Sequence, residues 1–171
     1  MHNLCANFLT LCSIVNFNFV YETREEFVMG IRNCTLQANT LMQPYERIPV
    51  NLSIAQAILE TGYGTSRFAL KGKNYYGIRE TDKTEPHIKS LHPNAHNKML
   101  RRYEESCDST FDYIELLNTD SRYKKYQDLL LEQWFINEYD LEILAEALAE
   151  PYALDRTYAY KLKTVLGVLN D

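Results

Sequence analysis

The chain of 171 residues has little of what would mark a membrane-spanning or nucleic-acid-binding protein. Its apolar stretch at residues 8–15 is too short to cross a bilayer. Its 18 Lys and Arg residues are outnumbered by 23 Asp and Glu residues, and the resulting net charge of −5 argues against binding a phosphate backbone, which needs a basic surface. The chain has no repeat and no low-complexity segment. What it does have is 46% hydrophobic and 24% charged residues, an ordinary composition for one globular domain with its own core.

Cysteine and histidine are scarce, and their spacing does not suit a metal site. The four cysteines are Cys5, Cys12, Cys34 and Cys107. They form no CxxC pair and no Cys/His zinc pattern, so we predict free buried thiols rather than a disulfide framework. His92 and His96 are four residues apart, but Pro93 lies between them in a polar segment, so we expect no metal ion there.

The first 20 residues leave two interpretations open. The stretch 8–15 has the character of a signal-peptide apolar region, yet no Lys or Arg precedes it, and the polar residues Asn16 and Asn18 come directly after it. A first helix packed on the core explains the stretch as well as an export signal does.

Hydrophobic periodicity predicts a mostly helical protein with one small irregular lobe. Apolar residues recur at helical spacing over 22–41. Residues suited to capping precede the later helices, which we expect to end near residues 60, 70, 117, 135, 150 and 169. These capping residues are Asn51 or Ser53, Thr65 or Ser66, Asp108 or Ser109, Ser121, Asp140 and Asp155. The segment 75–103 is polar and has no helical period, so we predict two or three short antiparallel strands there.

One carboxylate lies where a carboxylate is costly. Glu60 closes the nearly all-apolar segment 48–60, and Gly62 and Gly64 come soon after it. Apolar neighbours and the negative end of the helix dipole should both raise its pKa above that of an exposed Glu. A carboxylic acid that stays protonated near neutral pH is suited to general acid catalysis. A Glu that merely reaches solvent at a helix end is the structural alternative.

Four blocks occur in one order along the chain. They are 55–69 (AQAILETGYGTSRFA), 73–79 (KNYYGIR), 103–114 (YEESCDSTFDYI) and 151–162 (PYALDRTYAYKL). Together they resemble the conserved segments of the peptidoglycan N-acetylglucosaminidases of glycoside hydrolase family 73, and 118–123 is most similar to the Bax-like branch of that family. The resemblance covers roughly residues 45–166. This chain has Tyr63 where the family favours Trp, and Pro151 and Leu154 where the family favours Gly and Thr.

The resemblance implies a lysozyme-like α+β fold, mostly α-helical, with a small β lobe after the helix that bears the acid. Residues 1–44 would be a segment and helix packing on the catalytic domain, and 45–171 the glucosaminidase-like catalytic domain. The implied activity is hydrolysis of the β-1,4 bond after N-acetylglucosamine in peptidoglycan, in the cell envelope, without metal or organic cofactor. A lytic transglycosylase and a non-catalytic glycan-binding envelope module are the alternatives.

The resemblance also implies catalytic roles. Glu60 matches the general acid of the family. Tyr152 matches a tyrosine implicated in holding water or the acetamido group, and a core tyrosine is the alternative. The second acidic group would lie in the β lobe, where Glu85 ranks ahead of Glu80 and Asp82. A solvated loop carboxylate is the alternative for Glu85, and hydrolysis assisted by the sugar's own acetamido group would need no second carboxylate.

Substrate contacts are expected on both sides of the acid. They are Gly62, Tyr63, Asn74, Tyr75 and Tyr76, with at least one of the last two tyrosines lining the sugar groove. Tyr158 matches the family as well, but its spacing with Leu162 predicts a core position. We predict a core role for most of the 13 tyrosines, because a phenol ring suits a half-buried site as well as a sugar.

Overall fold

The computed structural model describes residues 18–91, 99–153 and 157–170. The apolar stretch 8–15, the His92–His96 pair and Asp155 lie outside these residues, as do Cys5 and Cys12. The predictions made for them therefore stay predictions.

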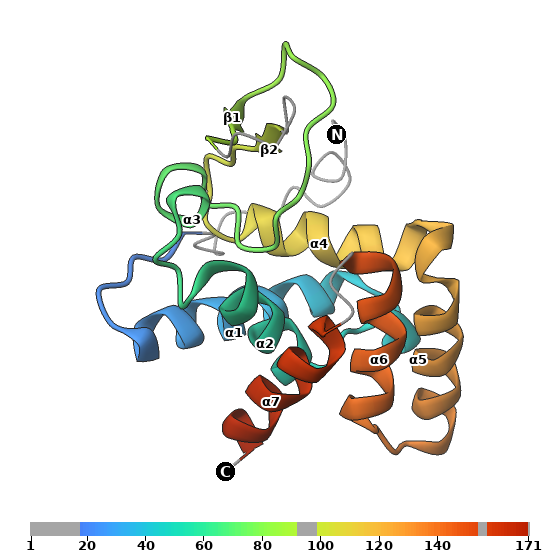
Figure 1. Ribbon diagram of the computed structural model, residues 1–171. Coiled ribbons are helices and arrows are strands. Elements are labelled where there is room, and N and C mark those ends of the chain that lie inside the picture. Colours follow the sequence, from blue (N-terminus) through green and yellow to red (C-terminus); the bar gives the residue numbers. More distant parts are fainter. Residues whose placement is uncertain (1–17, 92–98, 154–156, 171) are drawn as a thin grey trace, which may run out of the picture.

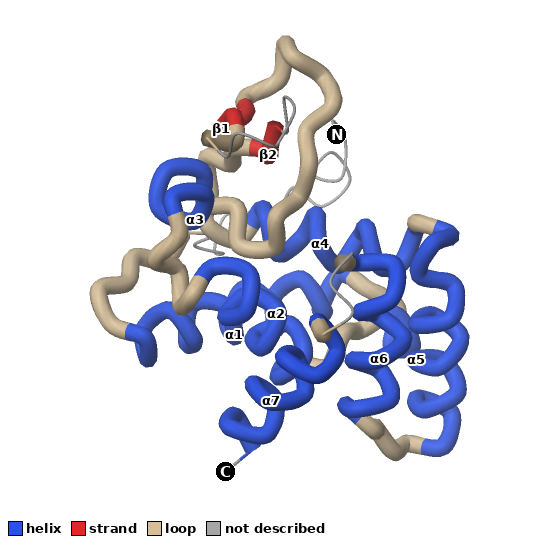
Figure 2. Tube along the Cα trace, viewed as in Figure 1, coloured by secondary structure: helices blue, strands red, loops and turns tan. Residues whose placement is uncertain are grey.

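Helices dominate the described part of the chain, and both strands lie in one lobe (Figures 1 and 2). The α-helices are α1 (Arg24–Leu41), α2 (Val50–Thr61), α3 (Arg67–Gly72), α4 (Asp108–Thr119), α5 (Lys124–Ile136), α6 (Leu141–Tyr152) and α7 (Tyr158–Asn170). Single 3-10 turns cover Pro44–Glu46 and Ser121–Tyr123. The strands are β1 (His87–Lys89) and β2 (Met99–Arg101). This arrangement confirms the predicted mostly helical α+β class.

Local capping explains several of the helix starts. At α1, the Glu26 backbone N–H donates to Thr23 Oγ1 at 3.1 Å, and the Thr23 backbone N–H donates to Glu26 Oε2 at 3.0 Å. Ser66 caps α3 and Asp140 caps α6, as predicted. The helix predicted from Ser121 is divided, because the chain first makes the turn Ser121–Tyr123 and α5 then begins at Lys124.

The predicted cap of α2 is wrong. The N-cap of α2 is Pro49, which makes no side-chain cap hydrogen bond. Ser53 lies inside the helix on its buried face, with its Oγ 2.8 Å from both Thr35 Oγ1 and Tyr76 Oη. The Ser53 hydroxyl therefore bonds two other hydroxyls in the core and does not cap the helix.

The helix α2 is the centre of the core. Its residues 52–58 are all buried, and α1 and α7 both pack against it (Figure 1). The helix α1 contributes Phe27, Ile31 and Ala38 to the same hydrophobic cluster and also contacts α4. The N-terminal helix thus packs on the predicted catalytic domain, while the domain boundary at residue 44 stays a prediction.

A disulfide between Cys34 and Cys107 corrects the prediction of free thiols for these two residues. Their Cα atoms are 5.0 Å apart, although 73 positions separate them in the sequence. Cys34 lies on the buried face of α1, and Cys107 immediately precedes α4. Because α1 packs against α4, the fold brings together two residues whose sequence spacing has no recognisable disulfide pattern.

The β lobe is a two-stranded antiparallel sheet between α3 and α4 in the sequence. His87 pairs with Arg101, and Lys89 pairs with Met99. An isolated bridge between Arg79 and Leu100 extends the pairing. These features confirm the predicted small lobe, which lies at the top of Figure 1 above α4.

Candidate active site

Glu60 lies in the last turn of α2, close to the residue that ends the helix. The backbone N–H of Gly62 donates to the Ile58 carbonyl at 2.8 Å, and Gly62 takes a left-handed conformation with φ of 60°. A residue without a side chain adopts this conformation without strain, so the helix stops here. The side chain of Glu60 is therefore partly exposed at the end of a helix that is otherwise mostly buried.

Tyr158 holds the Glu60 carboxylate through its hydroxyl. The phenol donates to Glu60 Oε1 at 2.8 Å and accepts from Gln56 Nε2 at 3.1 Å. Burial, and then the negative charge of Glu60, raises the pKa of Tyr158 far above its usual value, so the phenol remains a donor. The core position predicted for the Tyr158 ring is confirmed, but the sequence did not predict that its hydroxyl bonds Glu60. The one signal that could have found it is that Tyr158 falls within a matched block.

The start of the β lobe passes directly beside the carboxylate. A Cβ atom added to Gly77 would lie 3.5 Å from Glu60 Oε2, and Gly77 has a φ of +67°. The Tyr152 hydroxyl donates to the backbone carbonyl of Tyr76, the residue before this glycine. Three segments thus meet at Glu60: the end of α2, the start of the lobe, and the region where α6 ends and α7 begins.

The tyrosines around this junction form a stacked group. The rings of Tyr76 and Tyr113 are parallel within 3° at a centroid distance of 4.0 Å. Tyr152 meets Tyr113 edge-on at 6.3 Å and lies 5.5 Å from Tyr158. Burial and the charge of Glu60 raise the pKa of Tyr152 well above its usual value, so it is protonated at neutral pH. The packed rings therefore position two hydroxyls. That of Tyr158 bonds the Glu60 carboxylate, and that of Tyr152 bonds the start of the lobe.

Both tyrosines expected near the sugar groove are buried in the structure. Tyr75 is 1% exposed and packs among Phe19, Tyr21 and Phe27. Tyr76 is also 1% exposed. The structure thus places neither ring on an open surface, because the apolar faces of both are used in packing.

Asn74 braces the start of the lobe. Its Nδ2 donates to the carbonyls of Ile78 and Arg101 at 2.9 Å, and its Oδ1 accepts from the Ile78 backbone N–H at 3.0 Å. The side chain is 1% exposed. In this structure the polar atoms of Asn74 therefore bond to backbone on both sides of the lobe, which fixes the loop that carries Gly77.

Gly62 and Tyr63 remain on the surface at the end of α2. Gly62 is exposed and Tyr63 is partly exposed. The backbone of Tyr63 has a φ of 60°, and the Arg24 guanidinium lies 4.8 Å from the centre of its ring. Of the three tyrosines predicted to contact substrate, Tyr63 is the one with an accessible ring.

The three candidate carboxylates of the lobe have different surroundings. Glu85 is exposed in the turn before β1. Asp82 is exposed and accepts hydrogen bonds from the backbone N–H and hydroxyl of Thr84 at 2.8 and 2.7 Å. Glu80 is 8% exposed and bonds Arg101 at 3.0 Å. Hydrogen bonds from the backbone of Asp82 and Thr81 and from Arg101 lower the pKa of Glu80.

Arg101 extends this ionic contact to the helical part of the molecule. Its Nη1 lies 2.5 Å from Asp112 Oδ2, on α4, which also accepts from the Tyr103 hydroxyl at 2.9 Å. Both carboxylates are almost fully buried. The network Glu80–Arg101–Asp112–Tyr103 therefore fastens the lobe to α4, and Glu80 is the lobe carboxylate with a clear structural role.

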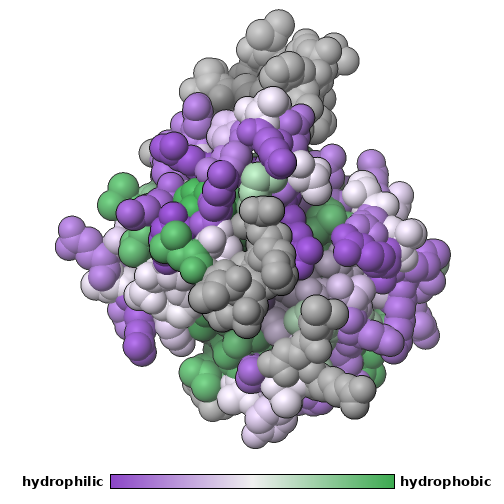
Figure 3. All heavy atoms as spheres, turned by 45° about the horizontal axis from the view of Figure 1, so that its top comes forward, coloured by the Kyte–Doolittle hydropathy of each residue, from purple (hydrophilic) through white to green (hydrophobic). Residues whose placement is uncertain are grey.

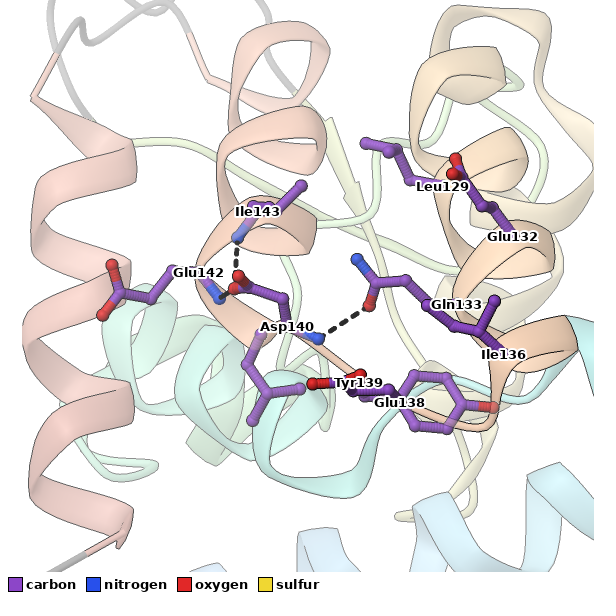
Figure 4. A pocket seen from close by; sticks show the side chains of 10 residues that line it. Leu129, Glu132, Gln133, Ile136, Glu138, Tyr139, Asp140, Glu142 and Ile143 are labelled. Atoms are coloured by element: carbon purple, nitrogen blue, oxygen red, sulfur yellow. Dashed lines mark hydrogen bonds between the residues drawn. The ribbon is translucent and has the colours of Figure 1, made fainter.

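A surface hollow elsewhere on the molecule is distinct from this junction. It lies between the C-terminal end of α5 and the N-terminal end of α6, has a volume of about 610 Å³, and includes Gln133, Ile136 and Tyr139 (Figure 4). None of the predicted site residues lines it. Within the described ranges, no three His, Cys, Asp or Glu side chains are grouped to hold a metal ion. Those ranges also contain no helix that is long and apolar enough to cross a membrane.

The fold and the site define a lysozyme-like domain with a carboxylate where a helical body meets a small β lobe. The family described as mannosyl-glycoprotein endo-beta-N-acetylglucosaminidase matches residues 36–171. The chain therefore belongs to this glucosaminidase family, as the sequence blocks predicted. The placement in the Bax-like branch stays a prediction.

Relatives and solved structures agree with this assignment. The exo-glucosaminidase LytG of Bacillus subtilis is 28% identical over 170 residues, which cover 92% of this chain and 56% of that protein. The chain thus spans just over half the length of this curated relative. The catalytic domain of the autolysin Auto from Listeria monocytogenes is 22% identical, with a TM-score of 0.64 and 88% of each chain covered. The glycoside hydrolase domain of FlgJ from Salmonella typhimurium is also 22% identical, with a TM-score of 0.63 over 87% of this chain and 89% of that one. At these identities the structural matches show a shared fold.

Proposed function

We propose that this chain hydrolyses the β-1,4 bond after N-acetylglucosamine in peptidoglycan, with Glu60 as the general acid. One observation carries the proposal: the Glu60 carboxylate is held by Tyr158 at a helix end, with Gly77 of the lobe beside it. Membership of the glucosaminidase family supplies the reaction class. The name of the relative LytG, an exo-glucosaminidase, supports the same chemistry.

In this mechanism Glu60 gives its proton to the glycosidic oxygen as the bond to the leaving sugar breaks. Tyr158 fixes the orientation of the carboxylate, since its hydroxyl donates to one oxygen and leaves the other facing Gly77. The absence of a side chain on Gly77 lets a sugar ring approach that oxygen closely.

Tyr152 has a second role in the proposal. Its hydroxyl bonds the Tyr76 carbonyl, so it holds the start of the lobe beside Glu60. The same hydroxyl is the candidate for positioning water or the acetamido group. For the second catalytic group we retain Glu85, and hydrolysis assisted by the acetamido group needs none.

Peptidoglycan lies outside the cytoplasm, so we propose that the protein acts in the cell envelope or is secreted. The Cys34–Cys107 disulfide supports this location, because disulfides persist in oxidising compartments and are rare in the cytosol.

Digestion of purified peptidoglycan, with mass spectrometry of the released ends, tests the proposal. Fragments with a reducing N-acetylglucosamine end are expected. Anhydromuramic ends would show a lytic transglycosylase instead. No released fragments, with the protein still bound to the wall, would show a glycan-binding module without catalysis.

A further inference from the structure

Charge is distributed very unevenly along this chain. The described residues 67–91 and 99–103, which we call the cationic segment, contain eight of the 18 Lys and Arg residues but three of the 23 Asp and Glu residues. The cationic segment therefore has a formal charge of +5, and the rest of the chain has −10. It comprises α3 and the β lobe. A net charge of −5 for the whole protein conceals two regions of opposite sign.

Arg101 of the cationic segment is paired with Glu80 and with Asp112 of α4, but most of the other cations of the segment have no such ion pair. Five of its cations are exposed, and none of them lies within ion-pair distance of a carboxylate among the described residues. They are Lys71, Arg79, Lys83, Lys89 and Arg102. In contrast, the Glu80 carboxylate is buried against Arg101. Exposed charges without ionic partners create a long-range field that attracts anions.

The cationic segment is also continuous with the candidate active site. Its Gly77 lies beside the Glu60 carboxylate, so a strand held at Glu60 would contact the start of the lobe. In Figure 3, where the lobe comes forward, hydrophilic side chains cover much of the surface around it. The opposite sign on the helical body repels an anionic polymer and leaves the lobe side as the favourable approach.

We propose that the cationic segment docks the carboxylate groups of the peptides attached to peptidoglycan strands. This inference rests on the proposed function, because it names which part of the substrate the lobe receives. The sugars alternate along the strand, and the peptides that they carry end in carboxylates. A lobe that begins beside Glu60 and carries several exposed cations would bind these groups while the glycan bond lies at the acid. The main effects would be faster encounter and correct orientation of the strand.

Two triple charge reversals test the proposal in a protein that cannot consume its substrate. The lobe variant is Lys83→Glu, Lys89→Glu and Arg102→Glu. The body variant is Arg47→Glu, Lys124→Glu and Lys125→Glu. Both change the net charge equally and both alter exposed residues. The body variant loses two surface ion pairs, which contribute little to stability. All are made with Glu60→Gln, and binding is measured by co-sedimentation with purified peptidoglycan.

At low ionic strength, the lobe variant should bind peptide-bearing peptidoglycan roughly tenfold more weakly than the parent, the lower end of effects expected from charge steering. The body variant should change binding less than about twofold. Raising salt from roughly 0.05 M to roughly 0.5 M should remove most of the difference, because exposed charges are then screened. Strands stripped of their peptides should bind the parent and the lobe variant nearly alike.

This inference would be overturned by equal losses in the lobe and body variants, by a loss that salt does not change, or by the same loss on stripped strands. A loss seen only on walls that retain phosphate-bearing polymers would also overturn it, since the anion would then be phosphate. Binding does not require catalysis, so failure of the digestion experiment and failure of this inference are separate outcomes.

Discussion

The helical body and the β lobe are stabilised in different ways. The body, made of α1, α2 and α4 to α7, buries residues 52–58 of α2 and carries the chain's negative charge. The lobe has two strands of three residues each, and residues 81–86 before β1 are all exposed. The body therefore can hold an acid in place, whereas the lobe depends on a few specific bonds to stay near it. Glu60 thus belongs to the densely packed region, and Gly77 beside it belongs to the region with few apolar contacts.

The largest effect should come from removing the acid from the body. Glu60→Gln keeps the side-chain shape but has no proton to transfer, so the hydrolysis rate should fall roughly 10²- to 10⁴-fold. The melting temperature should stay close to that of the wild type, because the amide can still accept from Tyr158. Rates on purified peptidoglycan and thermal unfolding of the same variant check both points. Near-normal lysis of cell walls would show that the acid lies elsewhere.

The second-largest effect should come from removing the disulfide of the body. The Cys34–Cys107 disulfide closes a long loop, and its loss in the double Ser variant should destabilise the protein by up to about 4 kcal/mol. We expect the melting temperature to fall by roughly 10 °C, the shift typical of such a loss in a domain of this size. Activity per folded molecule should be retained, because the bond is not part of the junction at Glu60.

Reduction of the wild type should reproduce the melting temperature of the double Ser variant. An unchanged melting temperature in that variant would contradict the stabilising role of the disulfide. A loss of activity without a loss of stability would show that the disulfide affects the lobe.

A smaller effect is expected from loosening the lobe at the junction. Tyr152→Phe keeps the ring in its stack but removes the hydroxyl that bonds the Tyr76 carbonyl. We expect kcat to fall about tenfold with KM nearly unchanged, as for an interaction that matters most in the transition state. Stability should drop by only about 1 kcal/mol, the contribution of one hydrogen bond. Unchanged kinetics with the same stability loss would make Tyr152 a packing residue.

The smallest effect should come from the ionic link between lobe and body. Glu80 has a lowered pKa in the folded protein, so its contribution to stability is present above the pKa of the unfolded chain, about 4.3, and is lost as pH falls through the folded value. Glu80→Gln should therefore lower the melting temperature by a few degrees at pH near 7, and the difference should shrink below pH of about 4. A difference that grows as the pH falls would contradict the assigned direction.

The sequence predicted the helices and the small lobe better than the contacts between distant residues. Helical periodicity depends on near neighbours, and it located the helices. The caps Ser66 and Asp140 were confirmed, whereas the predicted caps of α2 and α4 were wrong, because the N-caps there are Pro49 and Cys107. The disulfide, the position of Ser53 inside α2 and the hydrogen bond from Tyr158 to Glu60 depend on residues far apart in the sequence. Periodicity carries no information about such pairs.

The same limit applies to the tyrosines at the start of the lobe. A matched block indicated that Tyr75 and Tyr76 lie near the site, but it could not show that their rings face inward. Net charge was also misleading as a single number, because it averaged a basic segment with an acidic body.

Hydrogen exchange of the Glu60→Gln variant, with and without bound peptidoglycan fragments, tests the location of the site most directly. In the free protein, amides of the lobe should exchange faster than those of residues 54–59 in α2, since few apolar contacts hold the lobe. Bound fragments should slow exchange both at residues 60–64 and in the lobe. Slowing confined to the hollow between α5 and α6, or a free lobe as protected as α2, would contradict a site at the junction of body and lobe.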